Sequence, residues 1–110
     1  MPSRTDQSAT ERRLYAQLRQ LLTTPGLLRG NLVEMRRACG KATCRCARTP
    51  ASRHRALYLG LSLQGRRRMV YIPPAWEADV QRWVARYAQV RAVLEQLALR
   101  YLARVQRREG

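Results

Sequence analysis

Apolar residues near the N-terminus recur at helical spacing and predict a first helix. The repeated positions are Leu14, Leu18 and Leu21. Upstream, the run Ser8-Ala9-Thr10-Glu11 fits a capping box, in which a Ser hydroxyl and a Glu carboxylate each accept an otherwise unpaired backbone N–H. Pro25-Gly26 is typical of a helix end. We therefore predict a helix over residues 9–24, preceded by a polar, disordered segment of residues 1–8.

Strict alternation in the middle of the chain predicts a β-hairpin. Leucines occupy every second position from Leu57 to Leu63, which is the period of a half-buried strand. Gln64-Gly65 suits a two-residue turn, and residues 66–72 then alternate as the returning strand. A further extended segment over residues 27–38 supplies a third strand. The pattern therefore predicts a three-stranded antiparallel sheet.

A heptad pattern follows Pro73-Pro74 and predicts a long C-terminal helix over residues 74–108. Its seam positions are separated by four and three residues in alternation: Trp76, Val80, Trp83, Tyr87, Val90, Leu94, Leu97 and Tyr101. This helix is too long for the first helix to cover. We expect the remainder of the seam to contact a second copy of the chain, or a larger protein. The alternative is a purely intramolecular pair of helices.

The charge distribution indicates a polyanionic partner. The chain of 110 residues has 22 basic and 7 acidic residues and a net charge of +15, and no acidic residue lies between Glu34 and Glu77. A surface that only needs to be soluble mixes both signs of charge. A field of one sign attracts nucleic acid. The candidate phosphate-binding residues are Arg36, Arg37, Lys41, Arg45, Arg48, Arg53, Arg55, Arg66, Arg67 and Arg68.

A cluster of cysteines with one histidine predicts a structural zinc site. Cys39, Cys44 and Cys46 have the spacing C-x4-C-x-C, and the single histidine, His54, follows eight residues later. Three thiolates and one imidazole satisfy tetrahedral Zn²⁺, and metal binding would add folding energy that a small core lacks. The alternatives are reduced cysteines packed in a small core or redox-active thiols, with His54 contacting phosphate.

Catalysis is not expected from this sequence. The carboxylates are scattered and cannot form a two-metal site, and neither a Gly-rich phosphate loop nor a nucleophile motif is present. No apolar run reaches the roughly 20 residues of a membrane-spanning helix. We expect a cytoplasmic, nucleoid-associated protein whose thiols stay reduced.

The cysteine segment resembles a family of small, uncharacterised basic prokaryotic proteins. Residues 39–47 read C-G-K-A-T-C-R-C-A, and His54 follows, as does a hairpin and a long helix. Members of that family are often encoded near transposases and other mobile elements. The family pattern continues His-Gly-Pro, whereas Arg55-Ala56 follow the histidine here. The resemblance implies a metal-binding fold in a nucleic-acid context.

Together these patterns predict a single α+β domain, with a basic zinc-knuckle and hairpin module over residues 27–72 between two helices. The function favoured is that of a non-catalytic DNA-binding accessory protein, working as a dimer beside a recombinase, transposase or effector nuclease. One alternative is an RNA-binding ribonucleoprotein component, in which Tyr58 and Tyr71 stack on unpaired bases. The other is a helical adaptor that docks a larger protein.

Overall fold

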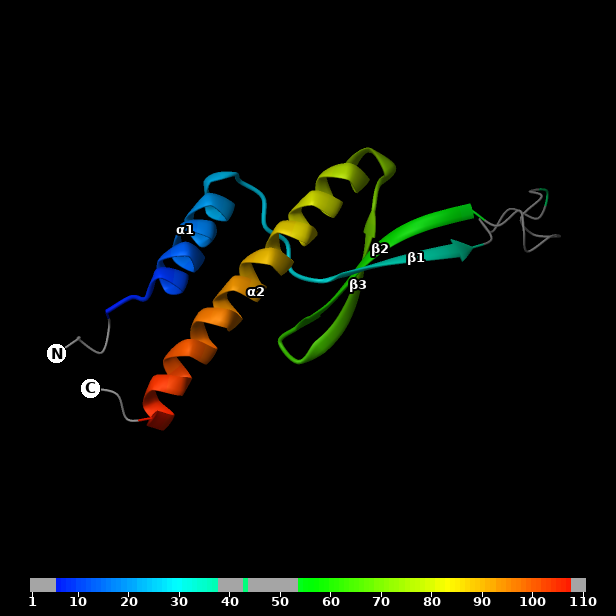
Figure 1. Cartoon of the computed structure of the whole chain (residues 1–110). Helices are drawn as coiled ribbons and strands as arrows, with labels where there is room; N and C mark the ends of the chain where they lie inside the picture. The colour runs from blue at the N-terminus through cyan, green and yellow to red at the C-terminus, as the bar shows by residue number, and fades with distance from the viewer. Residues whose placement is uncertain (1–5, 38–42, 44–53, 108–110) are drawn as a thin grey trace. The chain divides into compact units, whose positions relative to one another are not determined.

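The computed structural model describes residues 6–37, 43 and 54–107. It shows a helix, a three-stranded antiparallel sheet and a long C-terminal helix, so the predicted α+β class is confirmed (Figure 1). The elements are α1 (Ala9–Thr23), β1 (Asn31–Arg37), β2 (His54–Leu63), β3 (Arg66–Ile72), a 3₁₀ turn (Pro74–Trp76) and α2 (Glu77–Arg107).

The chain divides into two compact units. The first, called here the helical unit, comprises residues 1–27 and 85–110 and therefore contains α1 and most of α2. The second, called the sheet unit, comprises residues 28–84 and contains the three strands and the start of α2. Each unit has an apolar core of its own.

The N-terminus of α1 carries the predicted capping box. The backbone N–H of Glu11 donates to Oγ of Ser8 over 3.2 Å, and the backbone N–H of Ser8 donates to Oε1 of Glu11 over 3.1 Å. Both groups would otherwise lack an intrahelical partner. At the other end, α1 stops at Thr23 because Pro25 and Gly26 follow, the latter at a φ of 108°.

The core of the helical unit joins α1 to the C-terminal half of α2. Leu14, Val93 and Leu97 are buried together, and Tyr15, Leu18 and Leu21 pack against them. Arg86 holds the segment that follows α1, because its Nη1 donates to the carbonyl oxygen of Gly26 over 2.6 Å.

The packed face of α2 differs from the predicted seam at one position. Val93 is 2% exposed, whereas Leu94, which the heptad pattern placed in the seam, is 49% exposed. Adjacent residues are about 100° apart around an α-helix. Side chains of α1 pack on the side of α2 that carries Val93 and Leu97, so Leu94 is left exposed.

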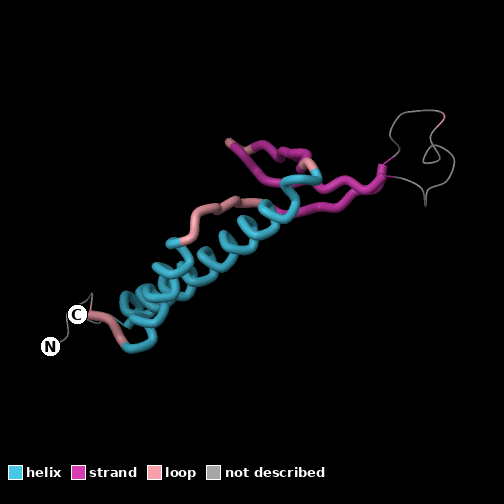
Figure 2. Tube along the Cα trace, turned by 90° about the horizontal axis from the view of Figure 1, so that it is seen from above, coloured by secondary structure: helices cyan, strands magenta, loops and turns pink. Residues whose placement is uncertain are grey.

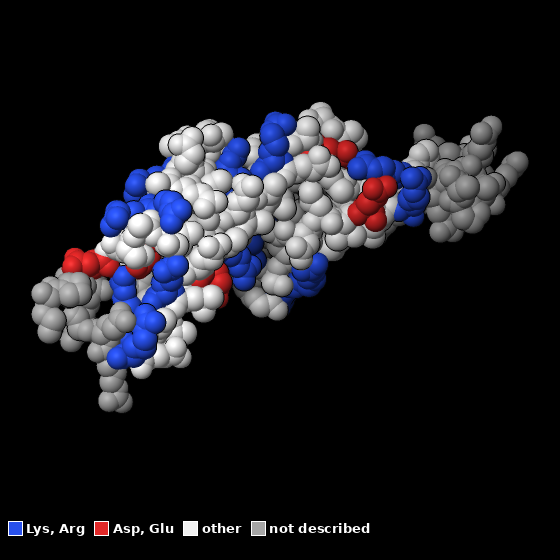
Figure 3. All heavy atoms as spheres, viewed as in Figure 1, with Lys and Arg blue, Asp and Glu red and all other residues white. Residues whose placement is uncertain are grey.

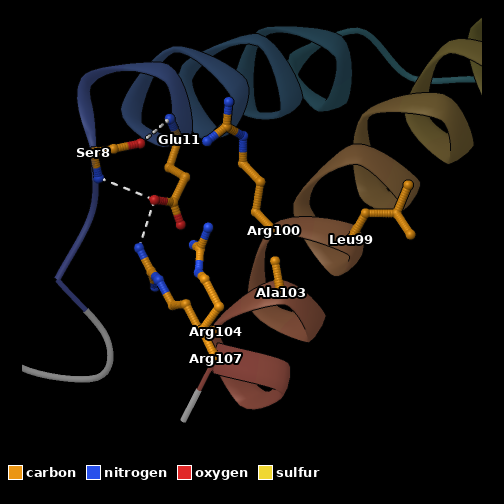
Figure 4. A pocket seen from close by; sticks show the side chains of 7 residues that line it. All are labelled: Ser8, Glu11, Leu99, Arg100, Ala103, Arg104 and Arg107. Atoms are coloured by element: carbon orange, nitrogen blue, oxygen red, sulfur yellow. Dashed lines mark hydrogen bonds and ion pairs between the residues drawn. The ribbon is translucent and has the colours of Figure 1, made fainter. Parts of the chain in front are cut away.

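A polar network crosses the helical unit beside this core. Glu11 is 2% exposed, and its Oε1 accepts a 2.5 Å hydrogen bond from Nη2 of Arg104 (Figure 4). The guanidinium of Arg104 lies 4.7 Å from the ring centroid of Tyr101, whose hydroxyl is 3.1 Å from that of Tyr15. A pocket of about 460 Å³ opens beside the network, and its walls are Ser8, Glu11, Leu99, Arg100, Ala103, Arg104 and Arg107.

The stability of the protein is expected to fall in acid partly through Glu11. Burial raises the pKa of its carboxyl, but hydrogen bonds from Ser8 and the charges of Arg104 and Arg100 outweigh burial, so the pKa lies below 4.5. A pKa lowered by folding adds stability above the unfolded value, and this stability is lost as the pH falls through the folded value. Urea titrations at pH 7, 5, 4 and 3 should show this decline, and Glu11→Gln should make it shallower. An equal decline in both proteins would contradict the assignment.

The sheet unit is a meander in the order β1-β2-β3, with both pairs antiparallel (Figure 2). Leu59 is opposite Leu32 on one side and Val70 on the other, and this register places alternate side chains on opposite faces. Gln64 and Gly65 connect β2 to β3 with φ values of 51° and 79°. Two positive φ values are what a type I′ hairpin turn requires, so the predicted turn is confirmed.

One face of the sheet is covered by the start of α2. Leu57, Leu59 and Ile72 are buried there against Val80. Five half-buried side chains complete the core: Leu28, Leu32, Leu61, Trp83 and Val84. The backbone N–H of Leu28 donates to the carbonyl of Trp83 over 3.2 Å and fixes the segment before β1 against α2.

Candidate nucleic-acid interface

The second face of the sheet carries several exposed side chains. The register gives it the side chains that alternate with the core leucines. Its described residues on the strands include Val33, Met35, Tyr58, Gly60, Ser62, Arg67, Met69 and Tyr71, which are called here the open face. Tyr71 is 51% exposed and Met69 is 43% exposed. No carboxylate belongs to this set, so the open face is apolar and cationic.

An aromatic pair occupies one end of the open face. Tyr58 of β2 is directly opposite Tyr71 of β3 in the register. Their ring centroids are 5.7 Å apart and the rings meet edge to face at 66°. Such pairs add favourable energy beyond the area they bury. The contact helps to fix the orientation of Tyr71, whose ring is half exposed.

Gly60 allows a guanidinium group to lie against the sheet beside this pair. A Cβ atom added to Gly60 would be 2.6 Å from Nη2 of Arg67 and 3.1 Å from Sδ of Met69. Both side chains therefore pass over the space where any other residue would have a side chain. A glycine inside a strand often marks such a close approach. The sequence analysis did not place Gly60 or Met69 among the candidate binding residues. The glycine within the alternation of leucines was the sequence feature that could have indicated them.

Three arginines follow the hairpin turn at the start of β3. Arg66, Arg67 and Arg68 are all exposed, and alternation sends Arg67 to the open face and the other two to the opposite face. Arg29 reaches the same hairpin, where its Nη2 donates to the carbonyl of Ser62 over 2.9 Å. Within the described residues, no carboxylate lies within ion-pair distance of the three consecutive arginines.

The acidic residues of the sheet unit are engaged elsewhere. Arg55 makes ion pairs with Glu77 over 2.9 Å and with Glu34 over 3.2 Å, and Arg36 lies 4.0 Å from Glu34. The hydrogen bonds and charge of Glu77, and then the charge of Glu34, raise the pKa of Arg55. Arg55 therefore has a carboxylate partner in both Glu34 and Glu77, which already occupy its guanidinium group. Asp79 pairs with Arg82 along α2.

Several predicted site residues lie outside the described part of the chain. These are Cys39, Lys41, Cys44, Arg45, Cys46, Arg48 and Arg53. Of Arg37 the structure gives the backbone, which is paired with His54 at the far end of β1 and β2. Among the residues it describes, no group of His, Cys, Asp and Glu side chains could hold a metal ion. The predicted zinc site thus stays a prediction.

The seam positions of α2 are shared between the two units. Val80 is buried in the sheet core, and Val90 and Leu97 are buried within the part of α2 that belongs to the helical unit. Trp83, Tyr87 and Tyr101 are half-buried, whereas Trp76 and Leu94 are exposed. Trp76 meets Trp83 edge to face, with ring centroids 6.0 Å apart.

No helix among the residues described has a stretch that is both long and apolar enough to cross a membrane. A search of curated proteins gave no match, and a search of solved structures gave none either. Comparison with models of protein families matches residues 7–82 to a domain of unknown function, DUF6788. The match runs from the capping box through the sheet into α2, and it covers more than half of the chain. The chain therefore belongs to the family defined by the DUF6788 domain.

Proposed function

We propose that the protein is a non-catalytic nucleic-acid-binding protein whose binding surface is centred on the hairpin of β2 and β3. The observation that carries the proposal is the run of three exposed arginines at the start of β3, of which Arg67 lies on the open face and the other two on the opposite face. None of the described residues of the open face is a carboxylate. In the view of Figure 3, arginine side chains form several patches on the face shown.

Phosphate binding suits this chemistry. The guanidinium group is planar and always charged, and it presents N–H donors in a fork that matches two phosphate oxygens. Such contacts supply most of the affinity for nucleic acid and make it depend on salt, because bound phosphates release their counterions. With a net charge of +15, the protein also attracts polyanions over a distance.

Replacing the hairpin arginines is expected to reduce both the affinity and its salt dependence. In Arg66→Gln/Arg68→Gln, the slope of log K against log salt should fall by about 2 for duplex DNA, and affinity should fall by about 10-fold or more. The measurement is fluorescence anisotropy with labelled oligonucleotides between low and physiological salt.

A matched control distinguishes the effect of the hairpin arginines from the effect of the protein's net charge. Arg12 and Arg13 are exposed on α1, in the other unit. Arg12→Gln/Arg13→Gln removes the same charge and should change the slope much less. Equal losses in both double variants would contradict a hairpin interface, and the absence of any binding near physiological salt would contradict the function itself.

We also propose that Cys39, Cys44, Cys46 and His54 hold a structural zinc ion. What supports this is the donor set itself, together with the pairing of Arg37 with His54, which holds the two ends of the cysteine-bearing segment side by side. A zinc ion there would restrict the motion of the end of β1 and the start of β2, which flank the arginines of that segment in the sequence.

An adaptor role is the second candidate, and exposed apolar side chains on α2 favour it. Leu94, Leu99, Leu102 and Val105 are all exposed within three turns of the helix. A helix with apolar residues on several sides is typically buried in an assembly. We propose a second copy of the chain as the partner. Sedimentation should show a dimer at micromolar concentration that Leu102→Arg dissociates, and a monomer at that concentration would contradict the proposal.

A further inference from the structure

We propose that the open face binds unpaired bases, so that the ligand of the proposed nucleic-acid site is a single strand. This inference rests on the proposed function and names its substrate class. A guanidinium group alone suits any polyanion, whereas Tyr71 and Met69 of the open face suit the flat faces of bases. Those faces are covered by their neighbours in a duplex and become accessible only where a strand is unpaired.

The side chains that carry the proposal follow one strand. Tyr71, Met69 and Arg67 alternate along β3 on the open face. Tyr71 supplies an aromatic ring, Met69 a polarisable thioether, and Arg67 a planar guanidinium that can stack on a base. Exposed aromatic residues on a small antiparallel sheet are a known way to stack bases without reading their sequence.

The spacing of these side chains excludes a ligand whose neighbouring bases stay stacked on one another. Successive residues on one face of a strand are about 6.6 Å apart, since each residue advances the chain by about 3.3 Å. Bases in a duplex are separated by about 3.4 Å. Bases lying on Tyr71 and on Met69 or Arg67 would therefore have to separate from each other. A single strand can do this, while a duplex would first have to open.

Gly60 contributes to the open face because it has no side chain. Because a Cβ atom there would meet Arg67 at 2.6 Å and Met69 at 3.1 Å, both groups can lie close to the backbone of β2. The obstructed atoms are ends of flexible side chains, which can move aside. Alanine should thus preserve the fold while displacing the guanidinium and the thioether from the sheet. This makes Gly60→Ala a test of geometry that removes no binding group.

The experiment compares a single strand with the matching duplex by fluorescence anisotropy, using labelled oligonucleotides of the same length. The wild-type protein should bind the single strand more tightly. Tyr71→Ala should weaken single-strand binding by about 5-fold to 100-fold and leave duplex binding within about 2-fold. Tyr71→Phe should retain the wild-type affinity, because the ring remains. Gly60→Ala should weaken single-strand binding by at least about 3-fold, with an unchanged circular dichroism spectrum.

The outcomes separate this inference from the function on which it rests. If duplex and single strand bind equally and Tyr71→Ala has no effect, the proposed function stands and base stacking is wrong. If Tyr71→Ala weakens both ligands equally, the tyrosine supports the fold and base stacking is also wrong. If neither nucleic acid binds near physiological salt, the proposed function is wrong as well.

Discussion

Replacing Glu11 with alanine is expected to lower the free energy of unfolding by about 3 kcal/mol. The carboxylate of Glu11 is buried, and it caps α1 through Ser8 while accepting a hydrogen bond from Arg104 of α2. Alanine removes the return bond of the capping box and leaves the guanidinium of Arg104 without this carboxylate. A loss of this size should lower the melting temperature by about 10 to 20 °C.

Two further variants show which interaction matters. Glutamine can still serve in a capping box but carries no charge, so Glu11→Gln should lose less stability than Glu11→Ala, and the difference measures the cap. Glu95 is exposed on α2 and provides a matched control. Glu95→Ala should change the free energy of unfolding by no more than about 0.5 kcal/mol. Equal effects at Glu11 and Glu95 would show that the buried network does not stabilise the fold.

Removing the proposed zinc ion is expected to destabilise the sheet unit. Residues 38–53 connect β1 to β2, which is long for the connection of an antiparallel pair. A metal ion bound within that segment would reduce the number of conformations that the long loop can adopt. The purified protein should contain one zinc per chain. A chelator should lower the melting temperature by about 10 °C or more.

The cysteine variant and its control give the decisive comparison. Cys44→Ser should abolish bound zinc and reproduce the effect of the chelator, and the chelator should then have no further effect. Thr43→Ser alters the neighbouring position without removing a ligand and should retain both zinc and stability. If metal content is negligible, or if the chelator leaves the melting temperature unchanged, the zinc proposal is wrong.

Much of the fold follows from local patterns in the sequence. The Ser8–Glu11 run predicted the start of α1, and Gln64-Gly65 predicted the hairpin turn, because capping and turn geometry depend on a few adjacent residues. The alternation of leucines in β2 predicted which of its faces is buried. The expected strand over residues 27–38 proved shorter, since β1 begins at Asn31, directly after Gly30. Gly30 has a φ of 147°, and a Cβ atom there would lie 2.7 Å from the side chain of Leu59.

Other features depend on contacts between distant parts of the chain. A heptad pattern alone cannot show on which side of a helix its neighbour will pack, and the packing of α1 decided that Val93 rather than Leu94 is buried. Likewise, the sequence marks Arg55 as one cation among many, whereas folding places it between Glu34 and Glu77.

By itself, the sequence determined the order of the elements, the basic character of the chain and the capping and turn positions. These depend on composition and on residues close together along the chain. Only the tertiary structure decided that one sheet face stays open, that Tyr58 and Tyr71 meet on it, and that Arg67 lies over Gly60. Such contacts arise from strand register and from the helix that covers the opposite face, and both are settled when the chain packs as a whole.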